Sequence, residues 1–187
     1  VPVNVGGYKV NFRQNQQLTL ENFEYLSNLQ RETLRTHRQG LIGSFMDGHK
    51  NKDGSFIKEK GFDWRGVRAD SRVDQVDLGA GGLNVDFTSS SLSGQDAKAA
   101  FIALTRRRYI DNKVTARATF YVSNEIMFNF MRDYSAEYKD VSIMTVLKRD
   151  LGANIVDIIP SSVLTGNQVL SIPMESRFIQ PLVGMGV

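Results

Sequence analysis

Cysteine is absent from the 187-residue chain, and long apolar runs are absent as well. The lack of cysteine excludes disulfides and thiolate metal sites, and it fits a reducing compartment. No apolar run approaches the ~18 residues of a membrane-spanning helix, so we expect no membrane partner. Charged residues make up 23% and aromatic residues 10% of the chain, which is typical of a folded protein and argues against global disorder.

Charge of one sign is also scarce, because the formal net charge is only +3. One basic block stands out between Lys98 and Arg117, and its centre is the triplet Arg106, Arg107 and Arg108. Such a triplet could contact phosphate or an acidic patch on a partner. It could also be the solvated end of a helix, where cations suit the helix dipole. The helix end is the preferred interpretation, and intersubunit salt bridging is a close alternative.

The first half of the sequence predicts a long helix followed by a loop-rich segment. Apolar residues recur at three- and four-residue steps from Leu20 to about Phe45, which predicts one amphipathic helix with Thr19 as its N-cap. The segment Asp47–Gly82 is rich in Gly, Asp and Lys, so we expect loops with one or two short strands. Before the helix, alternation in Val3–Phe12 predicts a strand.

The second half predicts a more regular series of helices and strands. The stretch "YVSNEIM" turns from strand to helix at Ser123, which predicts Ser123 as the N-cap, Glu125 in the first turn and Met131 against a core. The expected helices are Gln95–Tyr109, Asn124–Arg132 and Ser142–Leu151, and the expected strands are Ala116–Ser123, Ile155–Ile159, Gln168–Ile172 and Phe178–Gly184.

Residues that could carry catalysis or hold a metal occur without the companions that such chemistry needs. The segment from His49 to Lys60 matches a calcium loop only in part, because it ends in lysine where glutamate is required. Ser55 and Lys58 form a Ser-x-x-Lys pattern without its companion motifs, and Gly79–Gly82 lacks the spacing of a phosphate-binding loop. We therefore expect no enzymatic activity, no cofactor and no metal site.

The order of these elements resembles the major capsid proteins of tailed phages, which have the Hong Kong ninety-seven type shell fold. In the second half, "YVSNEIM", a short helix, a "DY" loop, another helix and "GANIVDIIPSSVLTGNQVL" are similar to the axial domain of that family. In the first half, "YKVNFRQNQ", the long helix, "KGFDWRG" and "GGLNVDF" are similar to the peripheral domain. The resemblance covers nearly the whole chain and rests on element order and loose patterns.

This resemblance implies an α+β capsid-type fold in three parts. Residues 1–85 would be a peripheral-domain portion with a long spine helix and a Gly-rich loop. Residues 86–180 would be the axial domain, and residues 181–187 would begin a return to the peripheral domain. The family's N-terminal arm, extended loop and final strand have no counterpart in the sequence, so we expect residues 1–187 to be the central part of a longer subunit.

The implied function is that of a structural shell protein, which self-assembles into an icosahedral phage head around DNA in the bacterial cytoplasm and resides in the virion. Its expected partners are copies of itself, other capsid or scaffolding proteins, and non-specifically contacted DNA. Two alternatives stay open: an encapsulin-type compartment, whose shell shares the fold, and a nucleic-acid-binding domain that uses the arginine triplet. The candidate intersubunit or genome contacts are Arg106, Arg107, Arg108, Lys58, Lys60, Arg65 and Arg68.

Overall fold

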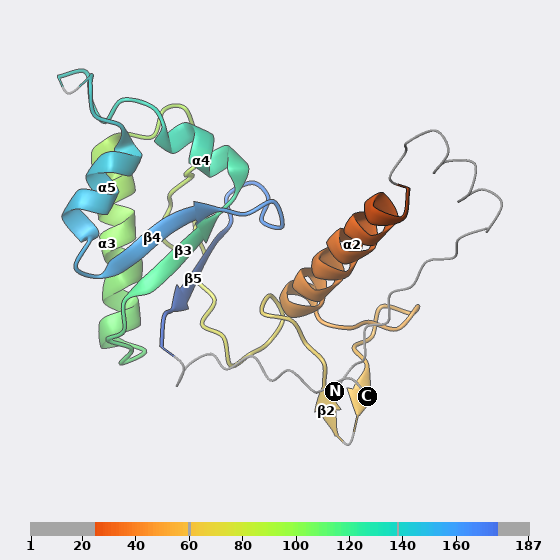
Figure 1. The fold of residues 1–187 in the computed structure, drawn as a ribbon. Coiled ribbons are helices and arrows are strands. Elements are labelled where there is room, and N and C mark those ends of the chain that lie inside the picture. The colour runs from red at the N-terminus through yellow and green to blue at the C-terminus, as the bar shows by residue number, and fades with distance from the viewer. Residues whose placement is uncertain (1–24, 60, 138, 176–187) are drawn as a thin grey trace. The chain divides into compact units, whose positions relative to one another are not determined.

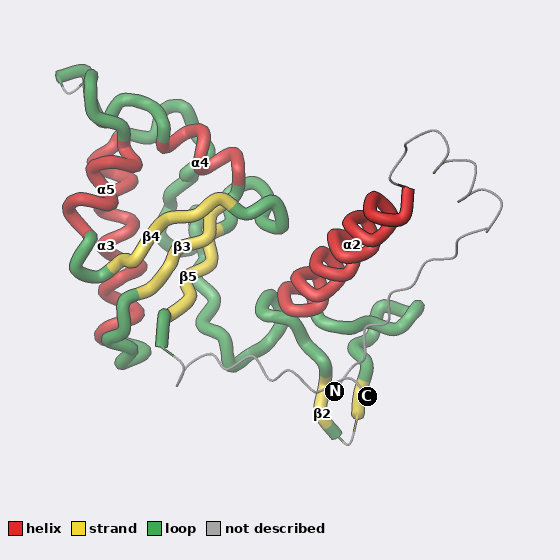
Figure 2. Tube along the Cα trace, in the orientation of Figure 1, coloured by secondary structure: helices red, strands yellow, loops and turns green. Residues whose placement is uncertain are grey.

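The chain is mixed α+β, as the sequence predicts, and it divides into two compact units, Val1–Asp74 and Gln75–Val187. A computed structural model describes residues 25–59, 61–137 and 139–175 (Figures 1 and 2). The elements of the first unit are α2 (Tyr25–Asp47), β1 (Lys58–Glu59) and β2 (Phe62–Asp63). Those of the second are α3 (Gly94–Ile110), β3 (Ala118–Val122), α4 (Asn124–Phe130), α5 (Ile143–Leu151), β4 (Ile155–Pro160) and β5 (Val169–Pro173).

Helix α2 confirms the long helix that the apolar periodicity predicts. It has 23 residues, which corresponds to about 35 Å at 1.5 Å per residue. The predicted N-cap Thr19 and the predicted strands Val3–Phe12 and Phe178–Gly184 lie outside the described residues. Within the described part of the chain, no helix combines the length and the apolarity that crossing a membrane requires.

After α2 the chain folds back onto the end of this helix. The backbone N–H of Val67 donates to the carbonyl of Phe45 at 3.0 Å, and that of Arg68 donates to Met46 at 3.1 Å. Gly66 lies so close to the backbone of Gly48 and Met46 that a Cβ atom would not fit. The short antiparallel strands β1 and β2 extend from this fold-back, as the sequence predicts for the loop-rich segment.

The second unit is built on a three-stranded sheet in the order β4-β3-β5. Strand β3 pairs in parallel with β4 and antiparallel with β5. The parallel pair requires a crossover, which α4 and α5 supply between β3 and β4. Side chains alternate along β3, so that Ala118, Phe120 and Val122 enter the core with Ile158 of β4.

The core of this unit lies between the sheet and its helices. Four phenylalanine rings meet there, with centroids between 5.1 and 5.8 Å apart in four of their pairs. Leu78 and Val85 pack against the same core, although the predicted boundary placed residues up to 85 in the first part. The four rings belong to Phe87, Phe101, Phe120 and Phe130.

Three serine N-caps explain where the helices of the second unit begin. The hydroxyl oxygens of Ser93, Ser123 and Ser142 each accept a hydrogen bond from the backbone N–H three residues later. This bond satisfies one of the N–H groups that the first turn of a helix leaves without an intrahelical acceptor. Replacing such a cap by alanine costs about 1 kcal/mol in general. Local hydrogen bonding therefore fixes α3, α4 and α5 at the predicted positions.

Candidate interaction surfaces

The arginine triplet does not form one exposed cluster. Arg106 and Arg107 are exposed, whereas Arg108 is only 7% exposed. Its Nη2 donates to the carbonyl of Asn154 at 2.9 Å, and its guanidinium lies 5.1 Å from the ring centroid of Tyr109. Burial lowers the pKa of Arg108 from its ordinary value, but a guanidinium stays charged at neutral pH. The structure therefore corrects the prediction for Arg108, which holds α3 to the start of β4 inside the fold.

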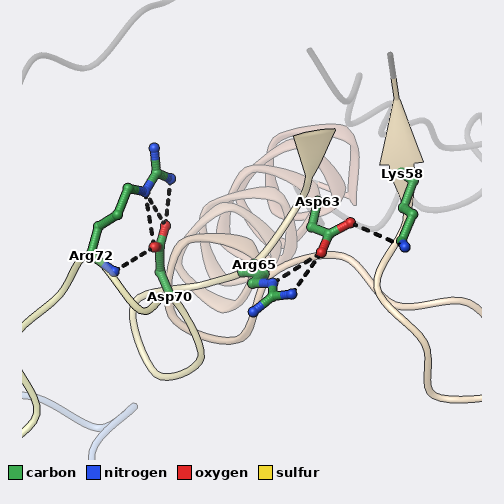
Figure 3. A network of polar contacts seen from close by, with 5 residues as sticks. All are labelled: Lys58, Asp63, Arg65, Asp70 and Arg72. Atoms are coloured by element: carbon green, nitrogen blue, oxygen red, sulfur yellow. Dashed lines mark hydrogen bonds and ion pairs between the residues drawn. The ribbon is translucent and has the colours of Figure 1, made fainter. Parts of the chain in front are cut away.

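The predicted cations of the first unit are largely neutralised by neighbouring carboxylates. The Asp63 carboxylate forms ion pairs with Arg65 at 2.8 Å and with Lys58 at 3.8 Å (Figure 3). Arg68 pairs with Asp47 at 2.7 Å, and Lys60 lies outside the described residues. Exposed pairs of this kind contribute little to stability. Their effect here is to reduce the positive potential that a genome-binding surface would need.

Asp70 and Arg72 form a second pair of the same type, and this pair gives a testable pKa. The Arg72 side chain holds the pKa of Asp70 at about 2, below the usual 3.8 (Figure 3). We expect Arg72→Gln to raise this pKa toward 3.8, as a carboxyl NMR titration would measure. Because the folded pKa is depressed, the pair stabilises the fold above about pH 4 and loses this effect as pH falls toward 2.

Lys52→Gln is the control for this titration, because it removes the same charge from an exposed lysine elsewhere in the first unit. If both variants raise the pKa of Asp70 equally, the general field of the unit sets the value and the pair does not.

Helix α2 carries an exposed apolar face. We define the α2 apolar face as Leu34, Leu41, Ile42 and Phe45, whose side chains are between 46% and 58% exposed. Leu34, Leu41 and Phe45 are seven and four residues apart, so they share one side of the helix. Of residues 27–47 in α2, Met46 alone is buried. The apolar periodicity predicted this face correctly but did not reveal that it is exposed.

Helix α4 exposes two further apolar side chains, Phe128 and Met131. The prediction that Met131 faces the core is wrong. The opposite side of α4 is anchored to the loop before α3, because Asn129 Nδ2 donates to the carbonyls of Phe87 at 2.7 Å and Ser89 at 2.9 Å. These polar bonds rotate α4 so that Met131 points outward. Spacing of apolar residues alone could not predict this rotation.

The strand-to-helix turn at Ser123 is structural. Ser123 is fully buried, its Oγ donates to the carbonyl of Gly166 at 2.6 Å, and it accepts from the N–H of Ile126 at 3.2 Å. The predicted N-cap is thereby confirmed, and the same hydroxyl attaches the turn before β5 to the start of α4. The hydroxyl is thus engaged on both its donor and its acceptor side, which gives no support to a nucleophile at this position.

Beside α3 lies a shallow groove of about 570 Å³, which sequence reasoning missed. Its lining combines apolar side chains, among them Leu92 and Ala99, with the carboxylates of Asp86 and Asp96. Both carboxylates accept local hydroxyl bonds, from Thr88 and Ser93 respectively. Within the described residues, no three His, Asp or Glu side chains come together as a metal site. The groove is therefore better suited to contact with an apolar and basic surface than to acid–base or metal chemistry.

The chain matches a known protein family over its whole length. Residues 1–187 match the model of a family of unknown function, DUF6260. No curated protein matches the chain. The match extends over both compact units, including the residues of α2, α3 and the groove. The chain therefore belongs to the DUF6260 family.

Proposed function

We propose that the chain is a structural subunit that assembles with copies of itself into a closed shell, of the kind formed by tailed-phage heads. The α2 apolar face is the observation that carries this proposal. Four large apolar side chains lie exposed on one helix, where they cost free energy in contact with water. Contact with another protein surface would remove that cost.

The energetics of the α2 apolar face suit repeated assembly. Complete burial of one Leu, Ile or Phe side chain stabilises by ~1.5–3 kcal/mol. These four side chains are already about half buried, so a contact would add only about half of that for each. One contact of this size is modest after the entropic cost of association. In a closed symmetric shell every copy repeats the contact, so modest interfaces add up to a stable particle.

The charge distribution favours a shell over a stand-alone nucleic-acid-binding domain. Arg65, Arg68 and Arg72 face carboxylates within the same unit, and Arg108 is buried. Strong non-specific binding to DNA requires several cations that neutralise phosphates and release counterions. In the proposed particle, the chain would contact packaged DNA weakly. An encapsulin-type compartment stays the alternative, and it would enclose protein cargo in place of DNA.

Negative-stain electron microscopy and sedimentation velocity of the full-length gene product, expressed in bacteria, test the proposal. We expect uniform closed particles that sediment far ahead of a monomer. Nucleic acid inside them would favour the phage head, and protein cargo would favour the compartment. A well-behaved monomer or dimer at high concentration, with no particles, would rule out the shell.

A variant of the α2 apolar face tests the specific surface. We expect the triple substitution Leu34→Gln, Leu41→Gln and Phe45→Gln to abolish particles while the circular dichroism spectrum is retained, because glutamine is a good helix former. Thr36→Gln changes an exposed residue on the opposite side of α2 and should leave assembly intact. Particles formed equally well by both variants would show that this face is not a contact.

A further inference from the structure

The side chains on the outward face of α3 follow a nearly symmetric order along the helix. They follow steps of three, four, three and four, which is the spacing of a seam between two packed helices. From the N-terminal end the order is acidic, small, small, basic and apolar. The residues in this order are Asp96, Ala99, Ala103, Arg106 and Ile110, and we call them the α3 seam.

The α3 seam lies opposite the buried side of the helix. Ala97, Phe101 and Arg108 point into the unit, whereas Ile110 is 60% exposed and Asp96 and Arg106 are exposed. Asp96, Ala99 and Ala103 line the groove beside α3. The seam therefore combines an open surface, two small apolar side chains and opposite charges on either side of them.

We infer that the α3 seam is a contact between two copies of the chain, packed antiparallel about a two-fold axis. The axis would pass between Ala99 and Ala103. Asp96 of each copy then faces Arg106 of the other. The two alanines lie opposite each other and let the helices approach to the lower end of the usual 8–10 Å separation. A two-fold contact of this kind uses the same patch on both copies.

Charge complementarity selects a second copy, in this orientation, as the occupant. Ten residues separate Asp96 from Arg106, which is about 15 Å along the helix axis. An antiparallel partner matches both charges at that spacing. A parallel partner in register would place carboxylate against carboxylate and guanidinium against guanidinium, which is repulsive. An acidic protein or a nucleic acid could engage Arg106 but would be repelled by Asp96 and Asp86, which line the groove.

This contact does not rest on the proposed shell, because a two-fold pair can form whether or not closed particles do. It should therefore be measured in the glutamine triple variant of the α2 apolar face. Loss of particles in that variant and loss of the α3 pair are then separate results.

A charge-swap cycle, read by sedimentation equilibrium, tests the inference. Asp96→Lys and Arg106→Glu should each weaken self-association about tenfold or more, because either change replaces two attractive contacts by two repulsive ones. The double variant restores both contacts with reversed charges, and we expect it to recover to within about threefold. Lys52→Glu, an equal charge change in the other unit, should have no effect.

Two results would overturn the inference. One is a chain that stays monomeric at every concentration reached. The other is a double variant as weak as, or weaker than, the single variants. Circular dichroism of each variant controls for folding, since Asp96 also accepts a bond from the N-cap Ser93. Self-association that rises on adding an oligonucleotide, and that Arg106→Glu alone abolishes, would assign the face to nucleic acid.

Cysteine cross-linking gives a second and independent measurement of orientation. The chain has no native cysteine, so Ala99→Cys and Ala103→Cys are the only thiols in their variants. In the antiparallel pair each introduced thiol faces an alanine of an identical partner. A mixture of the two variants should therefore form disulfide-linked dimers about tenfold faster than either variant alone, since disulfides require Cα atoms within ~7 Å. Equal cross-linking of the separate variants, or none in the mixture, would contradict the pairing.

Discussion

Phe101→Ala is expected to lower the free energy of unfolding of the second unit by about 3–5 kcal/mol, the usual cost of emptying a buried phenylalanine site. Phe101 is fully buried, and its ring meets those of Phe87, Phe120 and Phe130 at 5.4, 5.1 and 5.8 Å. These partners come from the loop before α3, from β3 and from α4. Truncation therefore leaves a cavity where three separate segments converge, and edge-to-face ring contacts are lost with it.

Urea denaturation followed by circular dichroism measures this effect. The single tryptophan, Trp64, belongs to the first unit, so its fluorescence reports separately on the unit that does not contain Phe101. Phe128→Ala is the matched control, because it removes a ring of the same size that is 71% exposed on α4. We expect the control to stay within about 0.5 kcal/mol of the parent. Similar losses for both variants would mean that the four rings do not form the stabilising centre of the unit.

The helices and strands could be predicted because interactions between residues close in sequence determine them. Serine caps, the apolar spacing of α3 and the glycine after α5 each act within a few residues of sequence. These signals located α3, α4, α5 and the three strands of the sheet to within a few residues. Sheet order and the rotation of α4 depend on pairing and anchoring between distant segments, which the sequence alone does not display.

The charged sites show a sharper division between what sequence can and cannot indicate. The motif Asp-x-Arg occurs at Asp63–Arg65 and again at Asp70–Arg72, and both are ion pairs in the structure. This repeated spacing was a usable sign that these cations are neutralised. No comparable pattern indicated that Arg108 is buried, because the two residues before it are also arginines. The position of the residue on the buried side of α3 decides its role.

Arg108→Ala is expected to destabilise the second unit by about 2–3 kcal/mol, whereas Arg106→Ala should change its stability by less than about 0.5 kcal/mol. Removing the Arg108 side chain leaves the carbonyl of Asn154 without its guanidinium donor and removes the guanidinium that lies 6.0 Å from the ring centroid of Phe120. Arg106 lies on the α3 seam, so its truncation should weaken self-association and leave the isolated fold unchanged.

Arg108→Met distinguishes the two parts of this loss. Methionine restores most of the buried volume but donates no hydrogen bond, so we expect a smaller loss than for alanine. Arg108 Nε is buried without a hydrogen-bond partner among the described residues. This unsatisfied donor limits the stabilisation that the buried guanidinium gives the fold. Urea denaturation of the three variants, followed by circular dichroism, provides the comparison. If Arg106→Ala proves as destabilising as Arg108→Ala, the triplet acts as one unit and its division into an inner and an outer part is wrong.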